Sequence, residues 1–185
     1  MLVGGSVYAF GAYSGALKTA LGMSQTQVAV VGVAGDVGLY TGYTMGYLYD
    51  HTQGPRTTLA AAAGAGVAGS LAAAAIVSAA SAASAGVVAL LCLAFYAIGQ
   101  GGHGFYTVGL VSNVGNYNPK FRGRALGAIV ASFGASPAFF ALLYRAVKPR
   151  VASYLVVVAL VIVGAAALGF ATLRVMPYGT LSPLA

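Results

Sequence analysis

Six long stretches almost free of charged residues constrain the fold of this chain more than any other feature of its sequence. They cover roughly residues 2–20, 25–48, 58–80, 86–114, 124–146 and 151–174. An α-helix needs about 20 mostly apolar residues to cross the hydrocarbon core of a bilayer. Short breaks with charged and turn-forming residues separate the stretches, so neighbouring helices are expected to be antiparallel in one compact bundle. The pattern predicts an all-α membrane protein with six transmembrane helices.

The low content of charged residues excludes an ordinary soluble domain. Asp, Glu, Lys and Arg make up 6% of the 185 residues, against about 25% in a typical soluble domain. A surface so poor in charge needs lipid as its solvent. We therefore expect an integral, multi-pass membrane protein that is surrounded by the lipid bilayer as a binding partner.

The formal net charge of +7 raises nucleic acid as a second partner, but the placement of the basic residues argues against it. The nine Lys and Arg residues stand at the ends of the apolar stretches and form no basic face with interleaved aromatic residues. This placement is typical of topology determinants and of contacts with lipid headgroups. No nucleic-acid binding is predicted.

The second stretch carries a polar face, and polar groups inside a membrane are expensive and often functional. At ~100° per residue, Tyr40, Tyr43 and Tyr47 project within about 40° of Asp36 on a helix. Three glycines at four-residue spacing lie on a different side, where they favour close helix packing. They are Gly38, Gly42 and Gly46.

The fourth stretch has a matching polar stripe, which consists of Tyr96, Gln100, His103 and Thr107. Four glycines between residues 99 and 104 favour either close packing or a locally opened backbone that lines a cavity. Two polar stripes at similar depth suggest a shared aqueous cavity, with Asp36, Tyr40 and Tyr43 on its other side. An equal alternative is a structural role, in which Asp36 and His103 bond to tyrosine hydroxyls or to each other in a dry bundle.

Few residues in the chain are suited to catalysis. Cys92 is the only cysteine, which excludes an intramolecular disulfide and a cysteine-based zinc site. Two carboxylates and two histidines leave little for acid–base chemistry. We therefore expect a protein that is not an enzyme, with no catalytic residues, no cofactor and no metal site.

Residues 46–56 resemble the signature G-x-L-x-D-R-x-G-R-R, which joins helices two and three in the major facilitator superfamily of transporters. The match rests on Gly46, Asp50, Gly54 and Arg56. His51 replaces the usual basic residue, one extra residue precedes Gly54, and a proline stands before Arg56. These departures affect the salt-bridge latch that the signature forms in that superfamily.

Longer segments resemble the nodulin-like branch of the superfamily in particular. Residues 8–14 with 17–18 are similar to its first helix, and residues 24–25 with 36–38 to its second. Residues 121–127 resemble the start of its fifth helix, and residues 174–177 the end of its sixth. The likeness covers nearly the whole chain and points to the N-terminal six-helix half.

The resemblance implies a transporter with two six-helix halves around a central cavity, which works by alternating access. We expect residues 1–176 to form one bundle, with the start of its first helix truncated, and residues 177–185 to begin an interdomain linker. Gly46, Asp50, Gly54 and Arg56 would form a conformational-switch loop, and Asp36 would serve coupling. The implied partners are a small solute and a second half from the same full-length chain, a homodimer or another subunit. Because a histidine can change charge near neutral pH, His103 adds a proton as candidate coupling ion.

The resemblance also places the turns after the second and fourth helices on the cytoplasmic side. Five basic residues would then lie inside, namely Arg56, Lys120, Arg122, Arg124 and Arg174, and four outside, namely Lys18, Arg145, Lys148 and Arg150. This small excess agrees with the positive-inside rule. The alternative function is a non-transporting membrane scaffold or regulatory subunit derived from a transporter half.

Overall fold

The computed structural model describes residues 1–52 and 54–175, and in these ranges every regular element is a helix. The predicted all-α class is confirmed. The elements in chain order are η1 (Leu2–Ala9), α1 (Phe10–Leu21), α2 (Gln25–Tyr40), α3 (Tyr43–Thr52), α4 (Pro55–Ala79), α5 (Ala85–Val114), α6 (Pro119–Gly134), α7 (Ser136–Val147) and α8 (Val151–Thr172). The linker expected over residues 177–185 lies outside the described residues.

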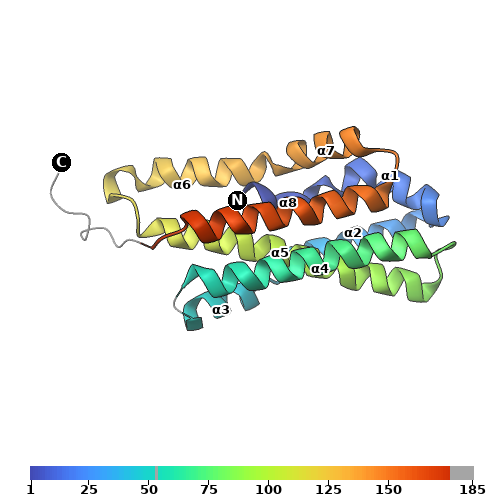
Figure 1. Cartoon of the computed structure of the whole chain (residues 1–185), viewed down its shortest axis with the longest axis horizontal. Coiled ribbons are helices and arrows are strands. Elements are labelled where there is room, and N and C mark those ends of the chain that lie inside the picture. Colours follow the sequence, from blue (N-terminus) through green and yellow to red (C-terminus); the bar gives the residue numbers. More distant parts are fainter. Residues whose placement is uncertain (53, 176–185) are drawn as a thin grey trace.

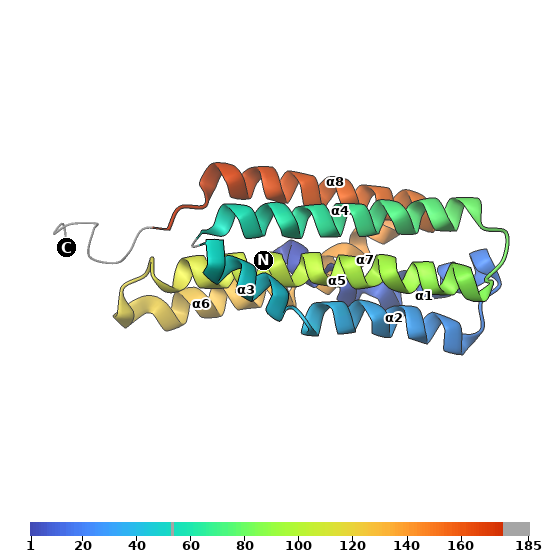
Figure 2. The same ribbon diagram turned by 90° about the horizontal axis from the view of Figure 1, so that it is seen from below.

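The helices run side by side along the long axis of the molecule, as two views at right angles show (Figures 1 and 2). The α5 helix packs against α4, α2 and η1, while α8 packs on the other side of α4. η1 also packs against α7. This arrangement makes α5 the central helix, with neighbours on several of its sides.

Four helical stretches are long and apolar enough to cross a membrane. They are Pro55–Ala79, Ala85–Val114, Pro119–Val147 and Val151–Thr172. These stretches overlap the last four that the sequence predicts. The fifth begins earlier than expected, at Pro119, because Asn118 caps the helix by accepting a hydrogen bond from the Lys120 N–H at 2.9 Å.

The first two predicted helices are interrupted, so the prediction of a single unbroken helix in each place is wrong. Residues 2–20 divide into the 3₁₀ helix η1, in which Gly5 has non-helical backbone angles, and α1. Residues 25–48 divide into α2 and α3, which continues to Thr52. Thr41 and Gly42 form the break between α2 and α3.

A smaller interruption divides the fifth predicted helix between α6 and α7, at Ala135. Pro137 stands in the first turn of α7. A proline has no N–H to donate to the preceding turn and its ring crowds the carbonyl four residues before it. The local sequence therefore explains this interruption directly.

The turns between helices are formed by residues with the expected conformational preferences. α1 ends at Gly22, which has a left-handed backbone (φ 62°) that suits glycine. Ser24 begins α2 with a capping box, in which its hydroxyl accepts from the Gln27 N–H and the Gln27 side chain accepts from the Ser24 N–H. Ser84 caps α5 with a single bond, because its hydroxyl accepts from the Val87 N–H.

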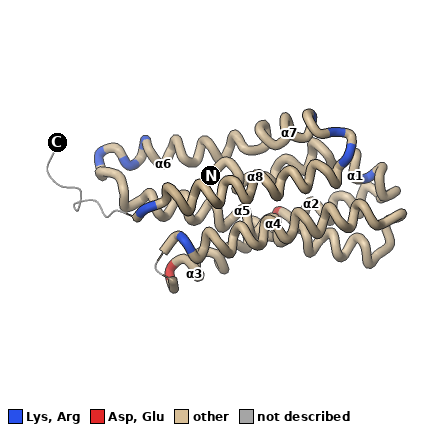
Figure 3. The backbone as a smooth tube through the Cα atoms, in the orientation of Figure 1, with Lys and Arg blue, Asp and Glu red and all other residues tan. Residues whose placement is uncertain are grey.

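The basic residues gather at the two ends of the bundle, and the middle of its length carries none (Figure 3). One end holds the α3–α4 and α5–α6 turns and the end of α8, while the other holds the α1–α2 and α7–α8 turns. The charges thus flank an apolar band about as long as the helices, as a bilayer requires.

Candidate functional site

The break between α2 and α3 is held by one side chain from the central helix, Gln100. Its Nε2 donates to the carbonyl oxygens of Gly38 at 2.8 Å and Thr41 at 3.3 Å. The same nitrogen lies 3.2 Å from the hydroxyl oxygens of Thr41 and Tyr96. Gln100 Oε1 accepts from the Thr44 hydroxyl at 2.7 Å. The amide therefore contacts the last turn of α2 and the first turn of α3 together.

These contacts satisfy backbone groups that the break sets free. In a continuous helix the Thr41 carbonyl would accept from the Met45 N–H, but here that N–H donates to Gly42 O at 2.9 Å. A buried carbonyl without a partner is costly. Gln100 supplies a donor to Thr41 O, which makes the interruption compatible with a membrane interior.

Glycines of α5 let three neighbouring segments approach its backbone closely. A Cβ on Gly99 would overlap the carbonyl of Gly35 on α2, and one on Gly102 would overlap the carbonyl of Gly4 on η1. A Cβ on Gly101 would stand 2.7 Å from Ala62 O on α4. α5 is continuous over Ala85–Val114, so the glycines between residues 99 and 104 serve close packing and do not open the backbone.

A cavity of about 350 Å³ lies next to this packed region, between η1, α2, α5 and α6. Its lining residues are Tyr8, Leu39, Tyr40, His103, Tyr106, Val130 and Phe133. The hydroxyls of Tyr8 and Tyr40 are 2.9 Å apart and hydrogen-bonded. The rings of Tyr106 and Phe133 meet edge to face, with centroids 5.0 Å apart. Aromatic rings and a few polar atoms thus line this central cavity.

Asp36 lies one helical turn before Tyr40 on the same face of α2 and acts electrostatically on Tyr8. The residue is partly buried. Among the described residues Asp36 has no hydrogen-bond or ion-pair partner, and neither has His103. The structural alternative expected these two residues to bond to each other or to tyrosine hydroxyls. The structure shows neither contact among the described residues.

The structure separates the predicted polar stripe of α5 into different surroundings. Only His103 lines the cavity. Gln100 and Thr107 are buried, and Tyr96 accepts hydrogen bonds from the Gln100 amide and from the Thr41 hydroxyl. On the other side, Tyr40 lines the cavity, whereas Tyr43 is 77% exposed on α3.

The four residues predicted for the switch loop lie at one end of the bundle. Gly46 and Asp50 belong to α3, Gly54 precedes α4, and Arg56 is in the first turn of α4. Within the described residues Asp50 forms no ion pair with Arg56. Their role in conformational switching stays a prediction.

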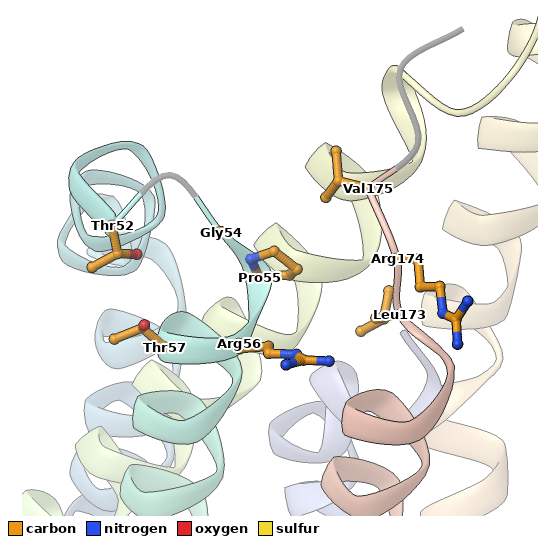
Figure 4. Close-up of a pocket in the computed structure, with 8 residues that line it drawn as sticks. All are labelled: Thr52, Gly54, Pro55, Arg56, Thr57, Leu173, Arg174 and Val175. Carbon is orange, nitrogen blue, oxygen red and sulfur yellow. The ribbon is translucent and has the colours of Figure 1, made fainter. Parts of the chain in front are cut away.

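Arg56 instead lines a second cavity, of about 380 Å³, at the same end of the bundle. This cavity lies between the α3–α4 turn and the residues after α8, and its other walls include Thr52, Thr57, Leu173 and Arg174. The Arg56 side chain extends across the gap toward the segment that carries Leu173 (Figure 4). Two exposed arginines at a helix end fit contacts with lipid headgroups.

Several residues of the central cavity and the break are not among those predicted from the sequence. Tyr8, Tyr106 and Phe133 line the cavity, and Thr41 and Thr44 bond to Gln100. Tyr8 and Tyr106 are polar aromatic residues inside predicted spans, which is a usable signal. Phe133 carries no polar atom and looks like any other core residue, so no sequence signal marks it.

Comparisons with known proteins identify one family. The family model described as Nodulin-like matches residues 1–182, nearly the whole chain. Comparison with curated proteins gave no match, and neither did comparison with solved structures.

Proposed function

Because the chain belongs to the Nodulin-like family, we propose that it forms a six-helix half of a secondary transporter, which moves a small solute by alternating access. The family points to a transporter-like membrane protein and not to catalysis. In this proposal the first span consists of η1 and α1, and the second consists of α2 and α3. The other four spans are the stretches that have sufficient length and apolar character.

The central cavity is the observation that carries this proposal. Its described lining includes no Lys or Arg, yet three tyrosines and a histidine contribute to it. Asp36 stands one turn away. Polar and ionisable groups at this depth are costly unless they pair, and they commonly mark solute or ion pathways. Asp36 and His103 are the candidates for binding a proton that accompanies the solute.

The break between α2 and α3 supports the conformational part of the proposal. Interrupted helices beside a central site are a recurring feature of secondary transporters. α3 is held to α5 at two points, through Thr44 on Gln100 and through Tyr49 on Ser112 at 3.1 Å. A change in these contacts would let α3 tilt relative to α2, which would move the predicted switch loop.

A second six-helix half completes the proposed pathway. Tyr40, Tyr43 and Tyr47 are 74%, 77% and 64% exposed along one face of α2 and α3. The Tyr40 hydroxyl bonds to Tyr8 and the Tyr47 hydroxyl to His51, but the Tyr43 hydroxyl bonds to none of the described residues and would lack a partner if it faced lipid tails. A facing half, from the same full-length chain, a second copy or another subunit, would enclose a polar pathway along these residues.

The test is uptake by the full chain reconstituted in liposomes, with a panel of radiolabelled small cations, anions and neutral solutes, with and without a pH gradient. We expect saturable uptake of at least one solute above that of empty liposomes. Asp36→Asn should reduce this uptake at least tenfold while the helical circular dichroism spectrum stays unchanged. Unchanged uptake by Asp36→Asn would contradict the role of Asp36.

The alternative function is a non-transporting scaffold or regulatory subunit derived from a transporter half. The exposed tyrosine face supports it to the same degree, because a partner protein would also cover that face. Uptake no higher than in empty liposomes for every solute, together with a stable complex with a partner, would favour this alternative.

A further inference from the structure

We infer that the central cavity binds a small organic cation, with a substituted ammonium group held between the rings of Tyr8, Tyr40, Tyr106 and Phe133. The inference rests on the proposed transport function and adds the chemical class of the solute. It follows from three properties of the cavity: its charge, its rings and its hydroxyl groups.

The charges around the cavity favour a cation over an anion. None of its described lining residues is a Lys or Arg, and the basic residues lie at the ends of the bundle (Figure 3). The carboxylate of Asp36 lies one turn before Tyr40 and interacts electrostatically with Tyr8, and both tyrosines line the cavity. In a pathway enclosed by the proposed facing half, a carboxylate attracts a cation and repels an anion more strongly than it does in bulk water. Because Asp36 has no partner among the described residues, its charge is available to a ligand.

The rings supply the second property. Phe133 is edge-on to Tyr8 at 5.8 Å and to Tyr106 at 5.0 Å between centroids. His103 adds another ring 6.2 Å from Tyr106. Rings at steep mutual angles present faces in several directions around one space, and the face of an aromatic ring attracts a cation. Recognition of quaternary ammonium groups by such aromatic cages follows from this attraction.

The hydroxyl groups supply the third property, because they bind the polar part of a cationic solute without adding positive charge. The Tyr8 and Tyr40 hydroxyls share one hydrogen bond at 2.9 Å, so one oxygen retains a proton to donate and both retain lone pairs. The volume of about 350 Å³ is at the lower end of small-molecule sites. A solute with a few carbon atoms and one ammonium group suits this space.

The test compares three probes of nearly the same shape and different charge: choline, its neutral isostere 3,3-dimethylbutan-1-ol, and the anion 3,3-dimethylbutanoate. Isothermal titration calorimetry measures their Kd for the full chain in a maltoside detergent, which contains no choline headgroup. We expect the Kd of choline to be at least tenfold lower than that of the isostere, and the anion to bind most weakly.

Variants of the cavity residues test whether the preference for choline over the neutral isostere arises in the cavity. Asp36→Asn should bring the Kd values of choline and the isostere within twofold of each other, and Asp36→Glu should keep them apart. Tyr106→Leu should weaken choline about tenfold, whereas Tyr106→Phe, which keeps the ring, should not. Tyr117→Leu is the matched control, because Tyr117 lies in the α5–α6 turn outside the cavity.

The inference would be overturned by equal or tighter binding of the isostere or the anion, or by no binding of any probe at millimolar concentration. Neither result decides whether the chain transports a solute of another class, which the uptake panel measures separately. A charge preference that Asp36→Asn leaves intact would also overturn the inference, because it would place the cation elsewhere.

Discussion

Gln100 shows how one amide makes an irregular backbone stable inside an apolar bundle. Its nitrogen and oxygen contact two carbonyls and three hydroxyls across the break. A hydrophobic side chain of similar size would fill the same space but leave Gly38 O and Thr41 O without this donor. The residue is therefore placed for structure, although it shares a helix face with His103.

Gln100→Leu should lower the free energy of unfolding by about 1–3 kcal/mol, the cost of leaving buried polar groups without partners. Thermal melting followed by circular dichroism at 222 nm, at one scan rate in detergent, measures the change in Tm. Thr107→Val is the matched control, because Thr107 is buried on the same helix without a hydrogen bond to any described residue. Equal melting of the two variants would contradict the assigned role of Gln100.

The three glycines of the second predicted span differ in how closely other segments approach them in the folded structure. A Cβ on Gly38 would overlap the backbone of Tyr96, and one on Gly42 would overlap the His103 ring. A Cβ on Gly46 would meet nothing within 4 Å. The same spacing in the sequence therefore serves packing at two positions only.

We predict opposite effects on stability for two alanine substitutions in this span. Gly38→Ala should destabilise the protein by about 1–3 kcal/mol, since Tyr96 backbone atoms cannot move aside easily. Gly46→Ala should be neutral or stabilise α3 by up to about 1 kcal/mol, because alanine favours helix more than glycine does. Urea or thermal melting of both variants tests this, and a destabilised Gly46→Ala would show that α3 packs against a further surface.

Hydropathy predicted the positions of the elements well, but it did not predict their interruptions. The break at Thr41 and Gly42 depends on Gln100 and His103, which are about 60 residues away in the sequence and reach it only in the fold. A periodicity argument assumes one continuous helix and therefore extends α2 through this point. Likewise, residues 100 and 103 differ by about 60° around a helix, which is enough to bury Gln100 and leave His103 at the cavity.

At the scale of the whole molecule, the exposed large side chains fall into two classes, apolar residues that fit lipid and tyrosines that fit water or a protein partner. Leu160 on α8 is 64% exposed and Tyr43 on α3 is 77% exposed. An apolar side chain on an apolar helix fits lipid, while a row of tyrosines fits water or a protein partner. The proposed pathway therefore lies along α2 and α3, and the lipid surface along α8.

Cysteine labelling distinguishes these two surfaces. In a Cys92→Ala background, Tyr43→Cys in native membranes should react with a charged maleimide at least tenfold faster than Leu160→Cys, because the thiolate forms only where water reaches it. Protection of Tyr43→Cys that disappears in detergent would indicate a dry protein interface instead. Fast labelling of Leu160→Cys would contradict the assignment of α8 to lipid.

Interrupted spans lie beside the cavity, and their location also affects how stiffness is distributed through the bundle. α4 and α8 are continuous over Pro55–Ala79 and Val151–Thr172 and line no part of the cavity. The breaks at Thr41–Gly42 and Ala135 belong to the helices that supply Tyr40, Val130 and Phe133. One side of the molecule thus consists of two continuous helices, whereas α2 and α6, which line the cavity, each end at an interruption. We therefore expect compression of the bilayer to change the shape of the cavity before it distorts α4 and α8, which would make the affinity of the proposed site depend on lipid thickness.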